Sequence, residues 1–226
     1  MYRGVMLNYW LFSVFSVNLI LMEQLLEHLF ESISKVRLLR LFIQNPETNY
    51  SFPDLLERTL LKPRNAKKEI TKFSKIGLIK AKDVVTKEPR LAPKKPKIKH
   101  TTVYQLRPDF PLLEELRALI IKSQVTSRKR LLRSIKHLGK VKLAVISGIF
   151  MNSDRARTDL LIVGDDVSKK KLQNFLVQIE SEIGKTIRYT LMDTDEYRYR
   201  LNMFDRFLRD IMEYPHEKLI NKYSTH

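Results

Sequence analysis

One segment of the sequence carries residue types that could bind nucleic acid, at helical spacing. Between Pro63 and Gly77, the apolar residues Ala66, Ile70 and Phe73 recur at intervals of four and three, which predicts a helix with one buried face. The opposite face would carry long cations for phosphates, together with an arginine and an asparagine able to contact guanine and adenine. The residues expected to bind DNA there are Arg64, Asn65, Lys67, Lys68, Thr71, Lys72 and Lys75.

A second basic segment follows at residues 86–100. Its sequence, TKEPRLAPKKPKIKH, predicts a loop that three prolines stiffen. The charge of this loop suits contact with the phosphate backbone or the minor groove. The cations expected to make this contact are Lys87, Arg90, Lys94, Lys95, Lys97 and Lys99.

The elements around these segments have a recognisable order. Helices are expected at 23–30, 33–43, 53–61 and from Pro63 to Gly77, a short connector at 49–52, and strands at 78–85 and 101–107. The last three of these helices and the two-stranded hairpin that follows them have the order of a winged helix-turn-helix domain. A basic helix alone is usually a solvated surface, but here the helix face, the element order and the basic loop agree. The sequence therefore predicts that residues 22–108 bind double-stranded DNA.

The first part of this domain also resembles bacterial and archaeal winged helix regulators. The resemblance rests on the helix KVRLLRLF, which begins at Lys35, and on the Gly77-Leu78-Ile79 exit from the basic helix. Winged helix proteins usually work as dimers on two-fold operators, so the resemblance implies a transcriptional regulator that forms a homodimer.

The distribution of charge favours the same partner. Lys and Arg outnumber Asp and Glu by 42 to 25, which gives a net charge of +17. Residues 62–100 hold 14 basic and 3 acidic residues, and residues 125–142 hold 7 basic residues and no acidic one. Such clustering is typical of a surface that binds a polyanion, either nucleic acid or an anionic membrane.

The composition gives little support for disulfide, metal or thiol chemistry. The absence of cysteine excludes disulfides, cysteine-based zinc sites and thiol catalysis, and five scattered histidines have no ligand spacing. No metal and no cofactor is therefore expected. Residues 109–139 predict a helical connector of two helices, the second strongly basic. That second helix could extend the DNA contact, bind nucleotide phosphates, or simply be solvated.

From Lys140 the pattern changes to alternating strands and helices. Strands are expected in KVKLAVISGIF, TDLLIVGD and IRYTLMD, with a helix in SKKKLQNFLVQIESEIG and one long closing helix over residues 194–214. This order resembles the minimal nucleotidyltransferase fold that is often fused behind winged helix domains. The expected fold class is thus α+β: a winged helix domain, then an α/β nucleotidyltransferase-like domain with a mixed sheet at residues 140–226.

The resemblance implies a site that has lost its catalytic residues. In the family, a Gly-Ser pair ends the first strand, and Asp-x-Asp on the second holds Mg²⁺ against a triphosphate. Here Gly148 matches the glycine, but Ile149 replaces the serine. Asp159 matches the second carboxylate, but Arg157 replaces the first, where its charge would repel Mg²⁺ and its guanidinium could occupy the metal's space.

We therefore expect a pseudoenzyme without catalytic or metal-binding residues, in which Gly148, Ile149, Arg157 and Asp159 mark a degenerate nucleotide site. Such a domain would serve in sensing or dimerisation, with a nucleotide or another anion as candidate ligand. One alternative is an active metal-dependent nucleotidyltransferase that modifies a nucleic acid or a protein, with Asp154, Asp159 and Asp165 as metal ligands. A second alternative is that the matches to the nucleotidyltransferase motifs arise by chance in an ordinary α/β domain.

Residues 1–21 form an apolar extension, in which Val5–Leu21 has no charged residue. This stretch is shorter than the ~20 apolar residues that a bilayer requires. We expect translation to start at Met22 and the regulator to be cytoplasmic, without membrane association. A membrane or packing helix, and hence a membrane-tethered regulator, is the second interpretation, and a cleaved signal peptide the third.

Overall fold

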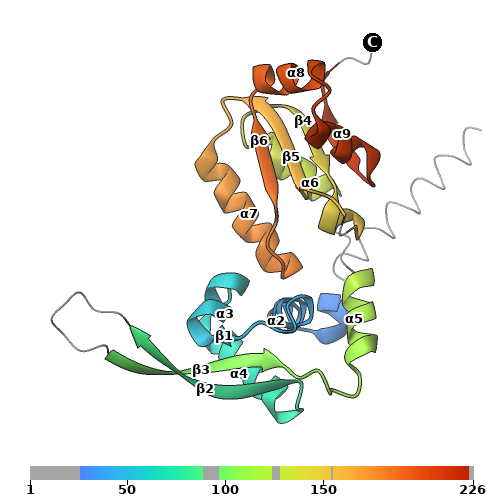
Figure 1. The fold of residues 1–226 in the computed structure, drawn as a ribbon. Coiled ribbons are helices and arrows are strands. Elements are labelled where there is room, and N and C mark those ends of the chain that lie inside the picture. Colours follow the sequence, from blue (N-terminus) through green and yellow to red (C-terminus); the bar gives the residue numbers. More distant parts are fainter. Residues whose placement is uncertain (1–25, 89–96, 124–127, 154, 224–226) are drawn as a thin grey trace, which may run out of the picture. The chain divides into compact units, whose positions relative to one another are not determined.

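The computed structural model describes residues 26–88, 97–123, 128–153 and 155–223, without the side chains of residues 86–88, 97–99 and 129. The fold is α+β, as expected, and contains two sheets (Figure 1). The described chain divides into two compact units. The first comprises residues 26–122 with 180–185, and the second comprises the described residues of 123–179 and 186–223.

The helices of the first unit begin and end close to the expected positions. Residues 26–30 are helical, and the helices that follow are α2 (Ile33–Gln44), α3 (Phe52–Thr59), α4 (Pro63–Lys75) and α5 (Leu113–Lys122). The side chain of Ser32 caps α2, and Ser51 and Asp54 form a reciprocal capping box at the start of α3. Pro63 opens α4, where a missing N–H does no harm.

The sheet of the first unit differs from expectation in two places. Its strands are β1 (Tyr50–Ser51), β2 (Ile79–Glu88) and β3 (Lys97–Leu106), antiparallel in the order β1-β3-β2. The expected connector at 49–52 contains β1, because buried Tyr50 pairs with Tyr104. The expectation of one loop over 86–100 is wrong at both ends, because the ladder between β2 and β3 continues to the pair Glu88–Lys97. The strand partner, which a local pattern does not show, extends both strands.

A single apolar core holds the first unit together. It includes Phe42 of α2, Leu55 of α3, Phe73 of α4 and Leu106 of β3, all buried. Leu113 and Ile120 bring α5 into the same core. Helix α5, expected in the connector, therefore belongs to the first unit.

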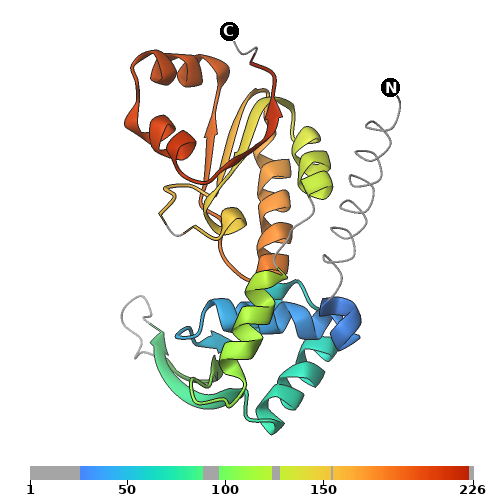
Figure 2. The same ribbon diagram turned by 90° about the vertical axis from the view of Figure 1, so that its right-hand side faces the viewer.

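The second unit is built on a mixed sheet. Its strands are β4 (Lys140–Ile146), β5 (Leu160–Asp165), β6 (Tyr189–Met192) and β7 (Glu217–Asn221), in the order β6-β5-β4-β7. Strands β5 and β6 are parallel and the other neighbours are antiparallel. The helices are α6 (Arg128–Lys136), the short 3-10 helix η1 (Gly148–Met151), α7 (Lys169–Ile183), α8 (Thr194–Asn202) and α9 (Arg206–Glu213); the last residues of α7, from Glu180 on, are counted with the first unit. Figure 2 shows α6 and α7 on one side of the sheet and α8 and α9 on the other.

The expected single closing helix over 194–214 is wrong. The helix stops after Asn202, and Asp205 starts a new one by accepting a hydrogen bond from the backbone N–H of Leu208. The break lets Leu208 and Ile211 of α9 pack on the sheet together with Tyr197 of α8. Strand β7, which was not expected, follows and pairs with β4. None of the helices in the described ranges is both long and apolar enough to cross a bilayer.

Candidate functional site

Helix α4 presents the polar face that the sequence predicts. Ala66, Ile70 and Phe73 are buried in the core of the first unit. All seven residues expected on the other side of the helix are exposed: Arg64, Asn65, Lys67, Lys68, Thr71, Lys72 and Lys75. We call these seven residues the α4 basic face. The structure therefore brings this part of the predicted site together on one rigid element.

The members of the α4 basic face are not equally available to a ligand. Lys72 Nζ lies 3.2 Å from Glu69 Oε1, and Glu69 is buried, so this lysine is held by a carboxylate of its own helix. The hydroxyl of Thr71 donates to the carbonyl of Lys67 at 2.9 Å. Among the residues that the structure describes, no ion pair involves the four remaining cations, which are Arg64, Lys67, Lys68 and Lys75.

The turn before α4 exposes its first residues. Leu60 ends α3 in the left-handed conformation, with φ at 54°, and the chain re-enters a helix at Pro63. Arg64 and Asn65 consequently lie in the first turn of α4. In helix-turn-helix proteins the N-terminal residues of the second helix contact the bases.

Two further exposed lysines of the first unit were not identified from the sequence. Lys62 immediately precedes α4, and Lys82 lies on β2. The period-two alternation of a strand could have revealed Lys82, since side chains two residues apart share a face.

The expected basic loop is only partly described. The backbones of Lys87, Lys97 and Lys99 belong to β2 and β3, but their side chains lie outside what the structure describes. Arg90, Lys94 and Lys95 lie wholly outside it. The expectation that these six cations contact DNA therefore stays a prediction.

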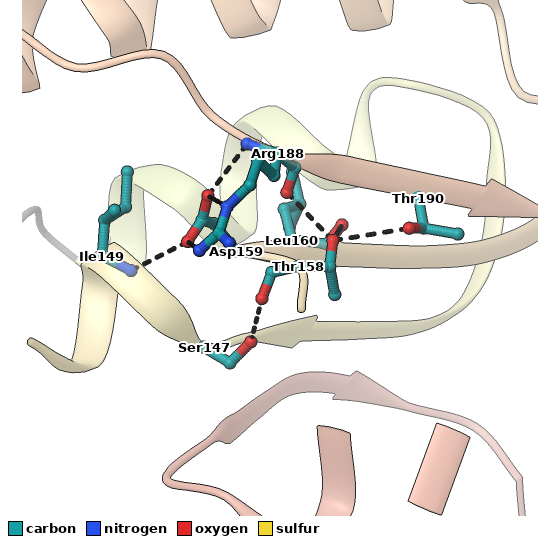
Figure 3. Close-up of polar contacts among 7 residues, drawn as sticks. All are labelled: Ser147, Ile149, Thr158, Asp159, Leu160, Arg188 and Thr190. Carbon is teal, nitrogen blue, oxygen red and sulfur yellow. Dashed lines mark hydrogen bonds and ion pairs between the residues drawn. The ribbon is translucent and has the colours of Figure 1, made fainter. Parts of the chain in front are cut away.

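The second candidate site centres on Asp159, at the start of β5. This carboxylate is fully buried and accepts four hydrogen bonds (Figure 3). The backbone N–H of Ile149 donates to Oδ1 at 3.0 Å, and that of Arg188 donates to Oδ2 at 2.9 Å. The guanidinium of Arg188 completes the set, with Nε at 3.1 Å from Oδ2 and Nη2 at 3.0 Å from Oδ1. Two backbone groups and one bidentate cation thus satisfy both oxygens.

Gly148 is required by the same carboxylate. Its φ is 55°, and a Cβ built on it would lie 1.9 Å from Asp159 Oδ1. The residue matched to a family glycine therefore makes room for a side chain of this chain itself. Ile149, in place of the family serine, contributes its backbone N–H rather than its side chain.

Hydroxyl groups join the strands around Asp159. Ser147 Oγ donates to the carbonyl of Thr158 at 2.5 Å, and Thr158 Oγ1 donates to that of Arg188 at 2.9 Å (Figure 3). These hydrogen bonds connect the ends of β4, β5 and β6. The arrangement resembles a structural junction more than an open catalytic cleft.

Arg157 forms an ion pair with a carboxylate of α9. Its Nε lies 2.7 Å from Asp210 Oδ2 on α9. The guanidinium that pairs with Asp159 is that of Arg188, and whether Arg157 fills the space of a metal stays a prediction. Arg188 is 29 residues from Asp159 in sequence, and no spacing signal connects the two.

The three carboxylates of the enzyme alternative do not form one site. Asp154 lies outside the described residues. Asp165 ends β5, six residues from Asp159, a separation of roughly 20 Å along a strand. Within the described ranges, no three His, Asp or Glu residues are placed to hold a metal ion.

Asp165 is instead bound to groups of its own unit. Lys142 Nζ lies 2.8 Å from its Oδ2, and Thr194 donates its hydroxyl at 2.8 Å and its N–H at 3.1 Å. These hydrogen bonds, that of Lys142 first, lower the pKa of Asp165 to about 2.

A lowered pKa makes a testable contribution to stability. An ordinary Asp titrates at about 3.9, so the ionised Asp165 stabilises the fold above that pH, and this contribution is lost as the pH falls through about 2. We expect Asp165→Asn to lower the free energy of unfolding at neutral pH, and the difference from wild type to shrink below pH ~4. Urea denaturation of both proteins over this pH range measures it. A difference independent of pH would contradict the assignment.

Comparisons with protein-family models, with curated proteins and with solved structures found no match for this chain.

Proposed function

We propose that this protein is a DNA-binding transcriptional regulator whose first unit is a winged helix-turn-helix domain. The α4 basic face is the observation that carries the proposal. A helix anchored by Ala66, Ile70 and Phe73 presents exposed cations, four of them without an ion pair among the described residues. A helix of this kind fits the major groove, where Lys and Arg bind phosphates and Arg and Asn read bases.

The surrounding elements support the same proposal. Helix α3, the turn at Leu60 and α4 form a helix-turn-helix, and the β2–β3 hairpin follows directly. The hairpin is long, with ten residues in each strand. In a winged helix protein such a hairpin contacts the backbone beside the groove that the helix enters, and the cations expected near its tip suit that role.

For the second unit we propose a nucleotidyltransferase-like fold that no longer transfers nucleotides. The order of β4, η1, β5, α7 and β6, with Gly148 after the first strand, supports the resemblance. The hydrogen bonds of Asp159 support the loss of activity, because Arg188 uses both carboxylate oxygens. A Mg²⁺ ion would have to displace this guanidinium to reach them. The unit would then serve in sensing or dimerisation.

This part of the proposal predicts no catalysis. We expect no Mg²⁺-dependent transfer from radiolabelled nucleoside triphosphates to DNA, RNA or protein, because among the described residues Asp159 is held by Arg188 and Asp165 by Lys142. Any nucleotide that binds should do so with the same affinity in Mg²⁺ and in EDTA, as isothermal titration calorimetry can measure. Transfer by the wild-type protein that EDTA abolishes would make it an enzyme.

Binding of the full chain to duplex DNA tests the proposal directly. Fluorescence anisotropy with a labelled duplex, from about 50 to 200 mM salt, should show affinity falling steeply because neutralised phosphates release counterions. Absence of binding at the lowest salt would refute the proposal.

A further inference from the structure

Helices α8 and α9 enclose an apolar groove on the second unit. The groove has a volume of about 230 Å³. Tyr197, Leu208 and Met212 line its inner part, and Leu201 and Phe204 are exposed at its edge. The groove lies on the side of the sheet occupied by α8 and α9 (Figure 2) and shares no residue with the α4 basic face.

Phe204 is unusual in both its exposure and its backbone conformation. It is 87% exposed, and its φ is 53°. A bulky side chain rarely adopts this left-handed conformation, in which Asn and Asp are several times enriched. Neither burial nor the turn between α8 and α9 accounts for a phenylalanine here. A contact that buries its ring in a complex would account for it.

The groove has room for such a ring. A dry protein cavity of about 150 Å³ is sufficient to bind benzene, and this groove is larger, at about 230 Å³. The exposed ring and the groove that could receive it lie on the same surface. A two-fold axis would therefore let each of two copies insert its ring into the other, which is the geometry of a closed homodimer.

The charge of this region allows two copies to approach. The chain as a whole carries +17, so most encounters between copies are repulsive. Residues 194–214 hold five acidic residues and four arginines. Asp205 and Arg209, of opposite sign, both line the groove. Each is compensated within its own copy, since Asp205 lies 4.0 Å from Arg200 and Arg209 lies 3.6 Å from Glu213, so this surface has little net charge to repel a second copy.

We propose that a second copy of this chain docks on the α8–α9 groove, with Phe204 of each copy inserted into the groove of the other. This inference rests on the proposed function, in which the second unit serves in sensing or dimerisation, and it specifies the dimer interface. It does not require the α4 basic face, so a failure to bind DNA and a failure to dimerise would be seen separately.

Sedimentation equilibrium of the full chain without DNA, over a wide concentration range, tests the proposal. The wild type is expected to be a dimer. Phe204→Asp and Leu201→Asp should each weaken dimerisation by at least roughly thirtyfold, the effect of removing an anchor residue. Leu201 is 53% exposed, and the control Leu112→Asp changes a leucine that is 58% exposed in the first unit. The control should remain a dimer.

Misfolding can be separated from loss of the interface. Aspartate suits a φ of 53° better than phenylalanine does, so Phe204→Asp should keep the circular dichroism spectrum of the wild type. A monomeric wild type would overturn the proposal. So would a Phe204→Asp variant that dimerises as tightly as the wild type, since the interface would then lie elsewhere.

Discussion

Replacing Lys67, Lys68 and Lys75 together by alanine should weaken binding to duplex DNA by on the order of a hundredfold at moderate salt. The slope of log affinity against log salt should become shallower by about three, because each lysine that no longer binds a phosphate leaves about one counterion unreleased. The three side chains are exposed and have no ion pair among the described residues. The fold should therefore be unaffected. Anisotropy titrations over a salt series measure both quantities.

A control with the same reduction in charge distinguishes a binding face from net charge. Lys136, Lys169 and Lys170 are also exposed lysines, on α6 and α7 of the second unit. Their triple alanine variant should change affinity by less than about threefold, through weaker long-range attraction alone. If both variants lost DNA affinity equally, we would conclude that the DNA-binding surface lies away from α4 or includes the second unit as well.

Base reading is expected from the first turn of α4 rather than from these lysines. Arg64→Ala or Asn65→Ala should reduce the preference for a specific site by about 1–3 kcal/mol if each makes a base contact. Binding to random DNA should be less affected by Asn65→Ala, which removes no charge. Equal reductions on specific and random duplexes would assign both residues to backbone contact.

Replacing Asp159 by alanine should lower the free energy of unfolding by about 2–5 kcal/mol, because each buried donor left without its acceptor costs roughly 1–3 kcal/mol. The carboxylate is fully buried, and its removal leaves the backbone N–H groups of Ile149 and Arg188 without their acceptor. The guanidinium of Arg188 loses its partner as well, although the side chain is 52% exposed and can reach water. Urea denaturation followed by circular dichroism measures the change.

The ion pair between Arg157 and Asp210 provides the matched control. The Arg157 side chain is 48% exposed, and Asp210, which is 14% exposed, keeps a second arginine, Arg206, at 3.9 Å when Arg157 is removed, so the loss should be close to the ~0–1 kcal/mol of an exposed pair. Arg157→Ala should therefore unfold at nearly the wild-type urea concentration. If Asp159→Ala were no less stable than Arg157→Ala, the Asp159 carboxylate would not be a structural group, and a role in ligand binding would regain support.

The sequence correctly predicted those parts of the fold that depend on a local pattern of residues. The buried and exposed sides of α4 follow from the spacing of Ala66, Ile70 and Phe73, because the period of a helix is a local property. The break before Asp205 was missed because residues 194–214 remain helix-forming on both sides of it. The side chain of Asp205, which caps α9, and the packing of Leu208 on the sheet make the segment two helices instead of one.

Features that depend on distant partners could not be predicted. Strand β7 is five residues long, without a clear alternation, and it is a strand because β4 offers it an edge. The bond from Arg188 to Asp159 depends on the register of β6 beside β5, in which Tyr189 lies opposite Leu160. The sequence indicated Arg157 as the cation of this site, whereas the guanidinium that pairs with Asp159 belongs to Arg188.

The hydrogen bonds between Arg188 and Asp159 also limit how this chain could change in evolution. If its ancestors were nucleotidyltransferases, regaining a metal site by Arg157→Asp alone would fail, because the guanidinium of Arg188 would still neutralise Asp159. Losing Arg188 first would leave a buried, unpaired carboxylate, at a cost of several kcal/mol. A typical domain has only about 5–15 kcal/mol of stability in total. With such ancestors, each order of substitution would pass through a poorly folded or inactive intermediate, and a loss of activity would be hard to reverse.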